Sequence, residues 1–306
     1  MRNMLAMTND LLLPIPHPAA QRRDVRLLLW RDDLLNPALP GNKARKLKYN
    51  LLRARAEGHT KLLTFGGAYS NHLAAVAAAG RLYGFATIGL VRGEERLPLN
   101  STLARCAADG MWLHYLDRTT YRRRAEPEFL AEMQRQFGPA YPLPEGGTNA
   151  LALRGVAELI GELRQHSDFD AVAVAAGTGG TLAGLTLGLA EAAYPARAVG
   201  VAALKGADFL RAEVDMLLAA AGCVGGQYEL HTGYHFGGYA KLPAELRAFI
   251  RQFEAESGVL LDPIYTGKLV FGVLDLIEKG HFAPGSTVVA VHTGGLQAWA
   301  GFNNYH

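Results

Sequence analysis

The chain has 306 residues, of which 49% are hydrophobic and 19% charged, the composition of a globular protein with a large buried core. Its net charge of +3 is small for this length, so no electrostatic argument favours nucleic acid or an anionic membrane as the main partner. Only Cys106 and Cys223 are present, and their spacing matches no metal-binding motif. We therefore expect a protein of the reducing cytoplasm without disulfides or a bound metal.

Two apolar segments could be mistaken for targeting or membrane sequences. The first sixteen residues include a three-leucine run, but not the longer apolar stretch and small-residue cleavage site of a secretory signal, so we expect no export. The uncharged stretch 171–190 is about long enough to cross a membrane, but glycines and threonines at 177–181 interrupt it. We interpret it as strand, loop and helix.

Short β-rich runs alternate with longer Ala/Leu-rich helical stretches along nearly the whole chain, which predicts an α/β protein with parallel sheets. No Pro/Gly/Ser-rich linker separates two halves, so two domains would have to be interwoven. The predicted strands, in chain order, are Val25–Trp30, Leu62–Phe65, Ala86–Val91, Met111–Tyr115, Ala171–Ala175, Ala198–Val201 and Thr287–His292.

The first chemical signal is Lys43, in the sequence Gly-Asn-Lys-Ala-Arg-Lys at 41–46. A lysine condenses with an aldehyde only as the neutral amine, so a catalytic lysine needs desolvation or nearby positive charge to lower its pKa. Arg45, Lys46 and Lys48 are candidates for that charge. Together with the glycine-rich turns that follow, Lys43 points to an anionic cofactor with an aldehyde, pyridoxal 5′-phosphate.

Ligand sites in parallel sheets lie beyond the carboxyl ends of the strands, and a glycine-rich loop follows the second predicted strand. It reads Gly-Gly-Ala-Tyr-Ser-Asn-His at 66–72 and leads into a helix of small residues. Its glycines let a ligand approach the backbone, and the start of the helix offers free N–H groups to a carboxylate. Ser70 and Asn71 could equally be ordinary helix caps, and His72 strengthens the functional interpretation.

A second glycine-rich loop, Gly-Thr-Gly-Gly-Thr at 177–181, lies between a strand and a helix. Backbone N–H groups and two hydroxyls could bind a phosphate here without a lysine, although a plain tight turn is the alternative. The loop is not a Walker sequence, and Leu182 stands where a dinucleotide fingerprint needs its third glycine. A nicotinamide enzyme is therefore disfavoured.

Two later loops complete the candidate site. Tyr265, before a predicted helix, is a candidate acid or base, although a tyrosine there can also be a packing residue. Thr293 ends the last strand in His-Thr-Gly-Gly, where its default role is to satisfy backbone groups. Lys268 is interpreted as a charge on the helix surface.

These five motifs, in this order, resemble the pyridoxal-phosphate enzymes of the tryptophan-synthase-β-like fold, fold type II. The similar branch contains 1-aminocyclopropane-1-carboxylate deaminase and D-cysteine desulfhydrase. The resemblance implies that Lys43 bonds to the cofactor and that the loop of Gly177, Thr178, Gly179, Gly180 and Thr181 holds its phosphate. It also implies cofactor contacts from Asn71, Thr266 and Thr293, catalytic roles for Ser70 and Tyr265, and a substrate pocket formed by Ser70, Asn71, His72, Tyr239 and Tyr265.

Two positions separate the two activities within this branch. The deaminase pattern has glutamate after the tyrosine and leucine after the histidine, where this chain has Thr266 and Thr293. The sequence therefore predicts α,β-elimination of a small amino acid, D-cysteine above others, giving pyruvate, ammonia and hydrogen sulfide. Deamination of the cyclopropane amino acid to 2-oxobutanoate is the alternative. A non-catalytic protein that binds pyridoxal phosphate or an amino acid is a more remote one.

The resemblance also implies an architecture. We expect a large domain from residues 1–45 and 141–306, a small domain from residues 46–140 inserted after the lysine, and the cofactor in the cleft between them. Each domain should contain a mostly parallel, open, twisted sheet flanked by helices. A homodimer and a small amino-acid substrate are the expected partners.

Overall fold

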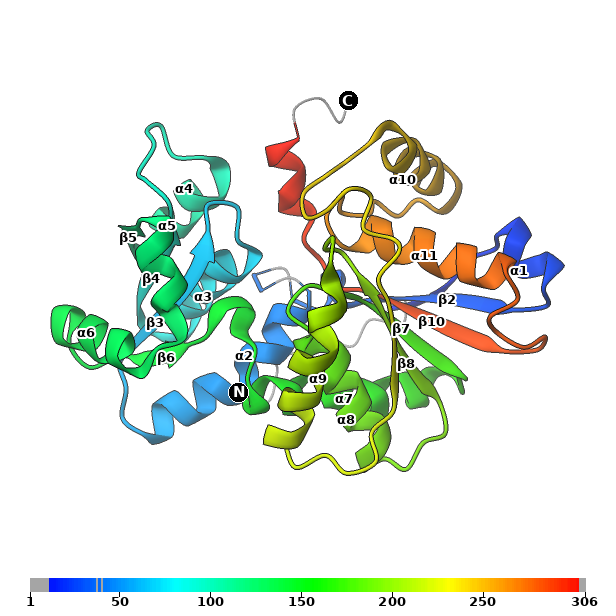
Figure 1. The fold of residues 1–306 in the computed structure, drawn as a ribbon, viewed down its shortest axis with the longest axis horizontal. Coiled ribbons are helices and arrows are strands. Elements are labelled where there is room, and N and C mark those ends of the chain that lie inside the picture. Colours follow the sequence, from blue (N-terminus) through cyan, green and yellow to red (C-terminus); the bar gives the residue numbers. More distant parts are fainter. Residues whose placement is uncertain (1–10, 37, 40, 303–306) are drawn as a thin grey trace.

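The computed structural model describes residues 11–36, 38–39 and 41–302. The described strands form two separate sheets, each with helices against both faces (Figure 1). The larger sheet has the order β1-β2-β10-β7-β8-β9, and the smaller has the order β5-β4-β3-β6. Every neighbouring pair is parallel except β1 with β2. The predicted α/β class with parallel sheets is confirmed.

The larger sheet is buried on both faces. Its strands are β1 (Leu12–Pro14), β2 (Arg26–Arg31), β7 (Ala171–Ala176), β8 (Arg197–Ala202), β9 (Tyr228–His231) and β10 (Thr287–His292). One face packs against α7 (Ala150–His166), α8 (Gly180–Glu191) and α9 (Leu210–Ala220), and the other against α1 (Pro18–Arg22), α10 (Ala244–Ser257) and α11 (Thr266–Glu278). Such double coverage explains why β7 is apolar at every position rather than at alternate ones.

The smaller sheet contains β3 (Lys61–Gly67), β4 (Ala86–Arg92), β5 (Met111–Leu116) and β6 (Tyr141–Leu143). Helices α2 (Asn42–Ala56), α3 (Asn71–Tyr83) and α4 (Ser101–Ala108) cover one face, and α5 (Arg118–Arg122) and α6 (Pro127–Phe137) cover the other. Five 3₁₀ turns complete the described elements: η1 (Asp32–Leu34), η2 (Arg123–Ala125), η3 (Glu145–Gly147), η4 (Ala207–Phe209) and η5 (Leu296–Gly301).

The division of the chain follows the two sheets. Because β6 belongs to the smaller sheet, we propose that the inserted domain ends after Leu143, three residues beyond the boundary expected from the sequence. Helix α2 connects the two domains, since Leu47 and Leu51 lie in the core of the smaller one while the helix also packs against α7.

The apolar stretch 171–190 is strand, loop and helix, as the sequence predicts. Helix α8 is apolar on all sides because it lies between the larger sheet and two further helices. It approaches α7 closely, since a Cβ added at Gly184 would lie 2.5 Å from the Val156 side chain. Within the described ranges, no helix is long and apolar enough to cross a membrane.

All seven predicted strands are present, with ends that differ by at most two residues. Strands β1, β6 and β9 are missing from the prediction. Each is three or four residues long and lies at the edge of a sheet, where the sequence pattern is weakest.

Candidate active site

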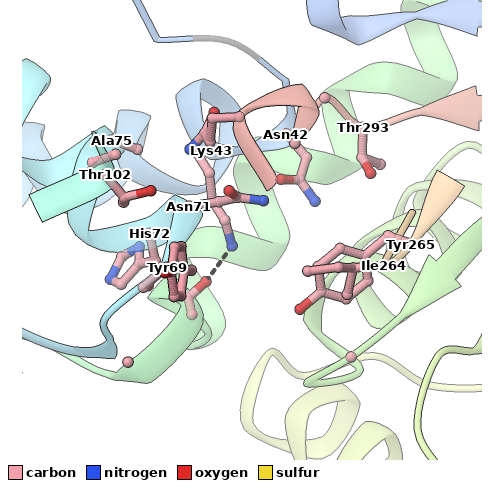
Figure 2. A pocket seen from close by; sticks show the side chains of 18 of the residues that line it. Asn42, Lys43, Tyr69, Asn71, His72, Ala75, Thr102, Ile264, Tyr265 and Thr293 are labelled. Carbon is pink, nitrogen blue, oxygen red and sulfur yellow. Dashed lines mark hydrogen bonds between the residues drawn. The ribbon is translucent and has the colours of Figure 1, made fainter. Parts of the chain in front are cut away.

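A cavity of about 1080 Å³ lies where the carboxyl ends of both sheets meet. The smaller sheet contributes the loop after β3 and the end of β4, and the larger sheet contributes the loops after β7, β8 and β10. The cavity brings together every residue predicted for the site except Thr266: Lys43, Ser70, Asn71, His72, Gly177, Thr178, Gly179, Gly180, Thr181, Tyr239, Tyr265 and Thr293. Figure 2 shows the Lys43 amine between His72 on one side and Tyr265 on the other.

Lys43 lies in the first turn of α2, and its Nζ donates a hydrogen bond to the Gly146 carbonyl oxygen at 3.0 Å. Burial lowers the pKa of Lys43 from 10.5 to about 8, because the charged form loses its hydration. About one molecule in ten therefore carries the neutral amine at pH 7, against roughly one in 3000 for a lysine of ordinary pKa. This is the protonation state that an aldehyde-binding lysine needs.

Of the two sources that the sequence left open for this pKa shift, desolvation and nearby positive charge, the structure supports desolvation. Arg45 is buried away from Lys43 and binds Asp32 at 2.9 Å and Glu162 at 2.7 Å. Lys48 pairs with Glu158 at 2.6 Å. Both cations are neutralised by partners, so burial rather than neighbouring positive charge lowers the pKa of Lys43.

We expect the rate at which apoenzyme captures pyridoxal phosphate to rise about tenfold per pH unit below pH 8 and to level off above it. The sign follows from burial, which disfavours the protonated amine and makes the reactive form available at lower pH. Stopped-flow absorbance between pH 6 and 10 measures the profile. Lys48→Met should leave it unchanged, and a midpoint near pH 10 would contradict the buried environment of Lys43.

The loop at 177–181 combines backbone and side-chain donors. Gly179 has a φ of 74°, which turns the chain into α8 and leaves the first N–H groups of that helix facing the cavity. Thr178 Oγ1 lies 2.7 Å from Thr148 Oγ1, and the Asn42 side chain donates to Thr181 Oγ1 at 2.9 Å. Hydroxyls and free N–H groups in this arrangement suit a phosphate dianion.

Lys46 also belongs to the candidate site. From its sequence it was expected only to contribute positive charge near Lys43. Its Nζ donates to Thr148 Oγ1 at 3.1 Å, and a Cβ added at Gly180 would lie 3.0 Å from the same Nζ. Burial and the nearby Lys43 hold the pKa of Lys46 well below its usual value. A bound dianion would favour the charged form, and Lys46 would then supply the positive charge that the loop itself lacks. The sequence did contain a signal for this role, because residues three apart in a helix, such as Lys43 and Lys46, lie on the same face.

On the smaller domain, Ser70 caps α3 by accepting a hydrogen bond from the Leu73 N–H at 3.2 Å, and its side chain also lines the cavity. The two interpretations of Ser70 are thus compatible. Asn71 Oδ1 is buried without a hydrogen-bond partner, and so is Thr102 Oγ1, a lining residue that the sequence analysis missed. Buried polar atoms are normally paired, so these two atoms indicate that a polar ligand completes the site.

His72 is fully buried, and its Nε2 lies 2.8 Å from Thr64 Oγ1. Because that hydroxyl donates to the Leu143 carbonyl, it accepts from His72, which places the histidine proton on Nε2. Burial, with Lys43 and Lys46 nearby, holds the pKa of His72 well below 6.5. His72 is therefore neutral, with an unpartnered Nδ1 available as an acceptor.

Tyr265 and Tyr239 face each other on the larger domain, with ring centroids 6.0 Å apart. Burial and the Tyr239 hydroxyl raise the pKa of Tyr265 well above its usual value, so Tyr265 is a proton donor at neutral pH. Thr266 does not line the cavity, since its hydroxyl donates to Asp262 Oδ2 at 2.7 Å at the start of α11. Its predicted cofactor contact remains a prediction.

Lys268 is not a surface charge, as the sequence analysis expected. It is fully buried, and its Nζ donates to the carbonyl oxygens of Ala203 at 3.1 Å and Gly238 at 2.8 Å. Burial lowers its pKa to about 8. Lys268 therefore ties helix α11, which begins after Tyr265, to the loop that carries Tyr239.

We expect Lys268→Met to lower the free energy of unfolding by about 2–4 kcal/mol, because two buried carbonyl groups lose their donor. It should also raise KM more than it lowers kcat, since Tyr239 is no longer held. Urea unfolding and steady-state kinetics measure the two effects. Lys279→Met, directly after the same helix, removes an exposed pair with Asp275 and a contact of the amine with the Tyr234 ring, and should change neither quantity appreciably. An unaltered KM in Lys268→Met would contradict the role of Lys268 in positioning the loop.

The residues present fit pyridoxal phosphate. The cavity offers a lysine of lowered pKa for the aldehyde, a hydroxyl- and amide-rich loop for the phosphate, and buried polar atoms without partners between them. The fold and this site together define an enzyme that uses pyridoxal phosphate. The sequence profile of the family described as pyridoxal-phosphate dependent enzyme matches residues 11–294, and the chain belongs to this family.

Individual relatives fall in the branch indicated by the motifs. A protein of Pyrococcus horikoshii named "Putative 1-aminocyclopropane-1-carboxylate deaminase" is 34% identical over 87% of this chain and 83% of its own length. A D-cysteine desulfhydrase of Klebsiella pneumoniae is 30% identical over 89% of this chain and 87% of its own length. A solved structure described as an ACC deaminase homologue superposes with a TM-score of 0.83 at 32% identity, covering 94% of this chain and 89% of that one.

Proposed function

We propose that the chain catalyses α,β-elimination of D-cysteine, giving pyruvate, ammonia and hydrogen sulfide. The observation that carries this proposal is the absence of a free carboxylate among the described residues lining the cavity. Only Asp109 and Glu145 are acidic there. Asp109 is paired with Arg81 and Arg105, and Glu145 with Arg124.

The charges around the cavity help to decide which of the two reactions the site can support. A carboxylate at the pyridine nitrogen would keep that nitrogen protonated and strengthen the ring as an electron sink, as opening a cyclopropane demands. Thr293 brings only a neutral hydroxyl to the cavity. A site of this kind suffices for expelling thiolate, a good leaving group, and supports elimination over ring opening.

When bound, the cofactor draws electrons from Cα of the attached amino acid and so makes its proton easier to remove. Lys43 Nζ, neutral in an appreciable fraction of molecules, accepts that proton as general base. The Cβ–S bond breaks with its electron pair on sulfur, the Tyr265 hydroxyl donates a proton to the departing thiolate, and the proton held by Lys43 Nζ restores the tyrosine hydroxyl. Water converts the released unsaturated amine to pyruvate and ammonia.

The remaining residues that line the cavity bind the cofactor and orient the substrate. Thr178, Thr181 and the α8 N–H groups bind the phosphate, with Lys46 as counter-charge. Ser70 and the first N–H groups of α3 would bind the substrate carboxylate, and Asn71 would hold the cofactor. His72 and Tyr239 line the pocket around the substrate. Movement of the smaller domain toward the larger would exclude water during the reaction.

Product analysis with purified holoenzyme tests the proposal. D-cysteine, L-cysteine and 1-aminocyclopropane-1-carboxylate are supplied separately, and sulfide, pyruvate and 2-oxobutanoate are measured. Sulfide with equimolar pyruvate from D-cysteine supports the proposal. Preferred formation of 2-oxobutanoate from the cyclopropane substrate would replace it with the deaminase, and absence of turnover with all three would favour a binding protein.

Assembly and location complete the proposal. We propose a homodimer, as the family resemblance implies, which light scattering after size exclusion would test. Cys106 is buried and both cysteines are free, which supports a reducing cytoplasm. Burial raises the pKa of the Cys106 thiol to about 12, so it is inert at neutral pH.

A further inference from the structure

A second cluster of functional side chains lies outside the cavity, at the edge of the larger sheet. Glu229 and His231 are two positions apart on strand β9, so both side chains point to the same face of the sheet. His281 follows the end of α11 and reaches the same point from that helix. One ligand atom from each of the three residues lies within 4.8 Å of the others.

The three side chains converge on one oxygen atom. His231 Nε2 lies 3.3 Å and His281 Nε2 lies 2.6 Å from Glu229 Oε2. The other carboxylate oxygen, Oε1, is held by Arg197 Nη1 at 2.6 Å. Arg197 thus fixes the orientation of the carboxylate and leaves Oε2 for the two imidazoles, the arrangement in which outer partners orient metal ligands.

We propose that Glu229, His231 and His281 form a binding site for one divalent transition-metal ion of the zinc type. Two imidazole nitrogens and one carboxylate oxygen are ligands that Zn²⁺ accepts. The three side chains are 27%, 23% and 28% exposed, so water can reach the fourth position of a tetrahedral ion. No ion is present there in this structure.

The two separations from Glu229 need only a small adjustment, and the two histidines, whose ligand atoms lie within 4.8 Å of each other, must reach the same spacing. Bonds of about 2.0–2.2 Å place tetrahedral ligand atoms roughly 3.3–3.5 Å apart. The separation between His231 and Glu229 already fits this requirement. His281 must withdraw by about 0.7 Å from its 2.6 Å contact, which a partly exposed side chain beyond the end of a helix can do. Binding releases any proton on either Nε2 to solvent.

The proposed metal site is separate from the active site, and an ion bound there would affect the stability of the fold. Helix α11 has thirteen residues, so the metal ligand after its last turn lies about 20 Å from Tyr265 before its first. In Figure 1, α11 extends away from the side that faces the smaller sheet. A bound ion would join edge strand β9 to the far end of the helix that begins at the catalytic tyrosine, and would stabilise the folded state by mass action.

The test titrates ZnCl₂ into holoenzyme that has been treated with EDTA and desalted into a non-chelating buffer. Calorimetry should give one micromolar site per chain, and thermal unfolding should show a higher Tm with Zn²⁺. The double variant His231→Gln/His281→Gln should bind about 100-fold more weakly or not at all, because two of three ligands are lost. Its turnover and cofactor absorbance without metal should equal those of the wild type, which also shows that it is folded.

His59→Gln is the matched control. His59 is 24% exposed and lies 3.6 Å from Glu57, but among the described residues it belongs to no group of three potential metal ligands. Its removal should leave the micromolar site unchanged. Zinc binding by the cofactor or the active site would persist in the double variant. The difference between the wild-type and double-variant titrations therefore measures binding at the proposed site alone. Wild-type binding no tighter than millimolar, or equal binding by the double variant, would show a hydrogen-bonded cluster only and overturn the proposal.

Discussion

Lys43→Ala should lower kcat/KM by about 10⁴-fold or more and abolish the absorbance band of lysine-bound cofactor. The side chain is proposed both to bond to the aldehyde and to remove the Cα proton, and neither role has a replacement at the same place. Cofactor should still bind without the covalent bond, since the phosphate loop is intact. Absorbance spectra with and without added pyridoxal phosphate, and sulfide release from D-cysteine, measure the two losses.

Lys46→Ala is the control that makes this prediction discriminating. Both amines line the cavity, and both approach the Gly146 carbonyl oxygen, at 3.0 Å for Lys43 and 3.5 Å for Lys46. Lys46, however, lies beside the phosphate loop through Thr148. We therefore expect Lys46→Ala to keep the absorbance band and to lose cofactor affinity about tenfold, the effect of one charged hydrogen bond. If Lys46→Ala loses the band and Lys43→Ala retains it, the two roles must be exchanged.

The sequence predicted those parts of the fold that have local signals. The central strands are apolar runs with glycine-rich turns at their carboxyl ends, and they lie where they were expected. The same turns contain most of the candidate site, because a loop after a parallel strand is identified by the strand before it and the helix after it. The family and its cofactor are confirmed by the comparison with known proteins.

What the sequence could not supply depends on partners distant in the chain. Lys268 has a surface-like position in its helix, and only the carbonyls of Ala203 and Gly238 make its burial possible. Arg45 looks like a charge for Lys43 until Asp32 and Glu162 are placed around it. The proposed metal ligands lie on a short edge strand that was not predicted and on a turn 50 residues later in the chain, so no motif joins them.

Close backbone contacts fix the start of α2 against the loop that follows β10. Gly41 precedes α2 with a φ of 73°, and the Asn42 N–H donates to the Thr293 carbonyl oxygen at 3.2 Å. A Cβ added at Gly41 would lie 1.9 Å from that oxygen. The start of the helix that carries Lys43 is thus held directly against the loop after β10, and any side chain at position 41 must push them apart.

Gly41→Ala should therefore weaken cofactor binding by about 100-fold and lower the free energy of unfolding by roughly 3–5 kcal/mol, the sum of backbone strain and overpacking. Displacement of α2 moves Lys43 and Asn42 away from the phosphate loop, which is why affinity falls together with stability. Titration of apoenzyme with pyridoxal phosphate and urea unfolding of the same preparation measure both quantities.

The variant Gly138→Ala distinguishes the effect of backbone strain from the effect of the contact between position 41 and Thr293. Gly138 has a φ of 78° and an extended ψ of 178°, close to the conformation of Gly41, but a Cβ there meets only the flexible Lys61 Nζ at 3.3 Å. This variant should lose about 1–3 kcal/mol from strain alone and bind the cofactor normally. If Gly41→Ala were no worse than Gly138→Ala in both assays, contact with Thr293 would not be what positions Lys43, and the lysine would owe its place to the Arg45 ion pairs with Asp32 and Glu162.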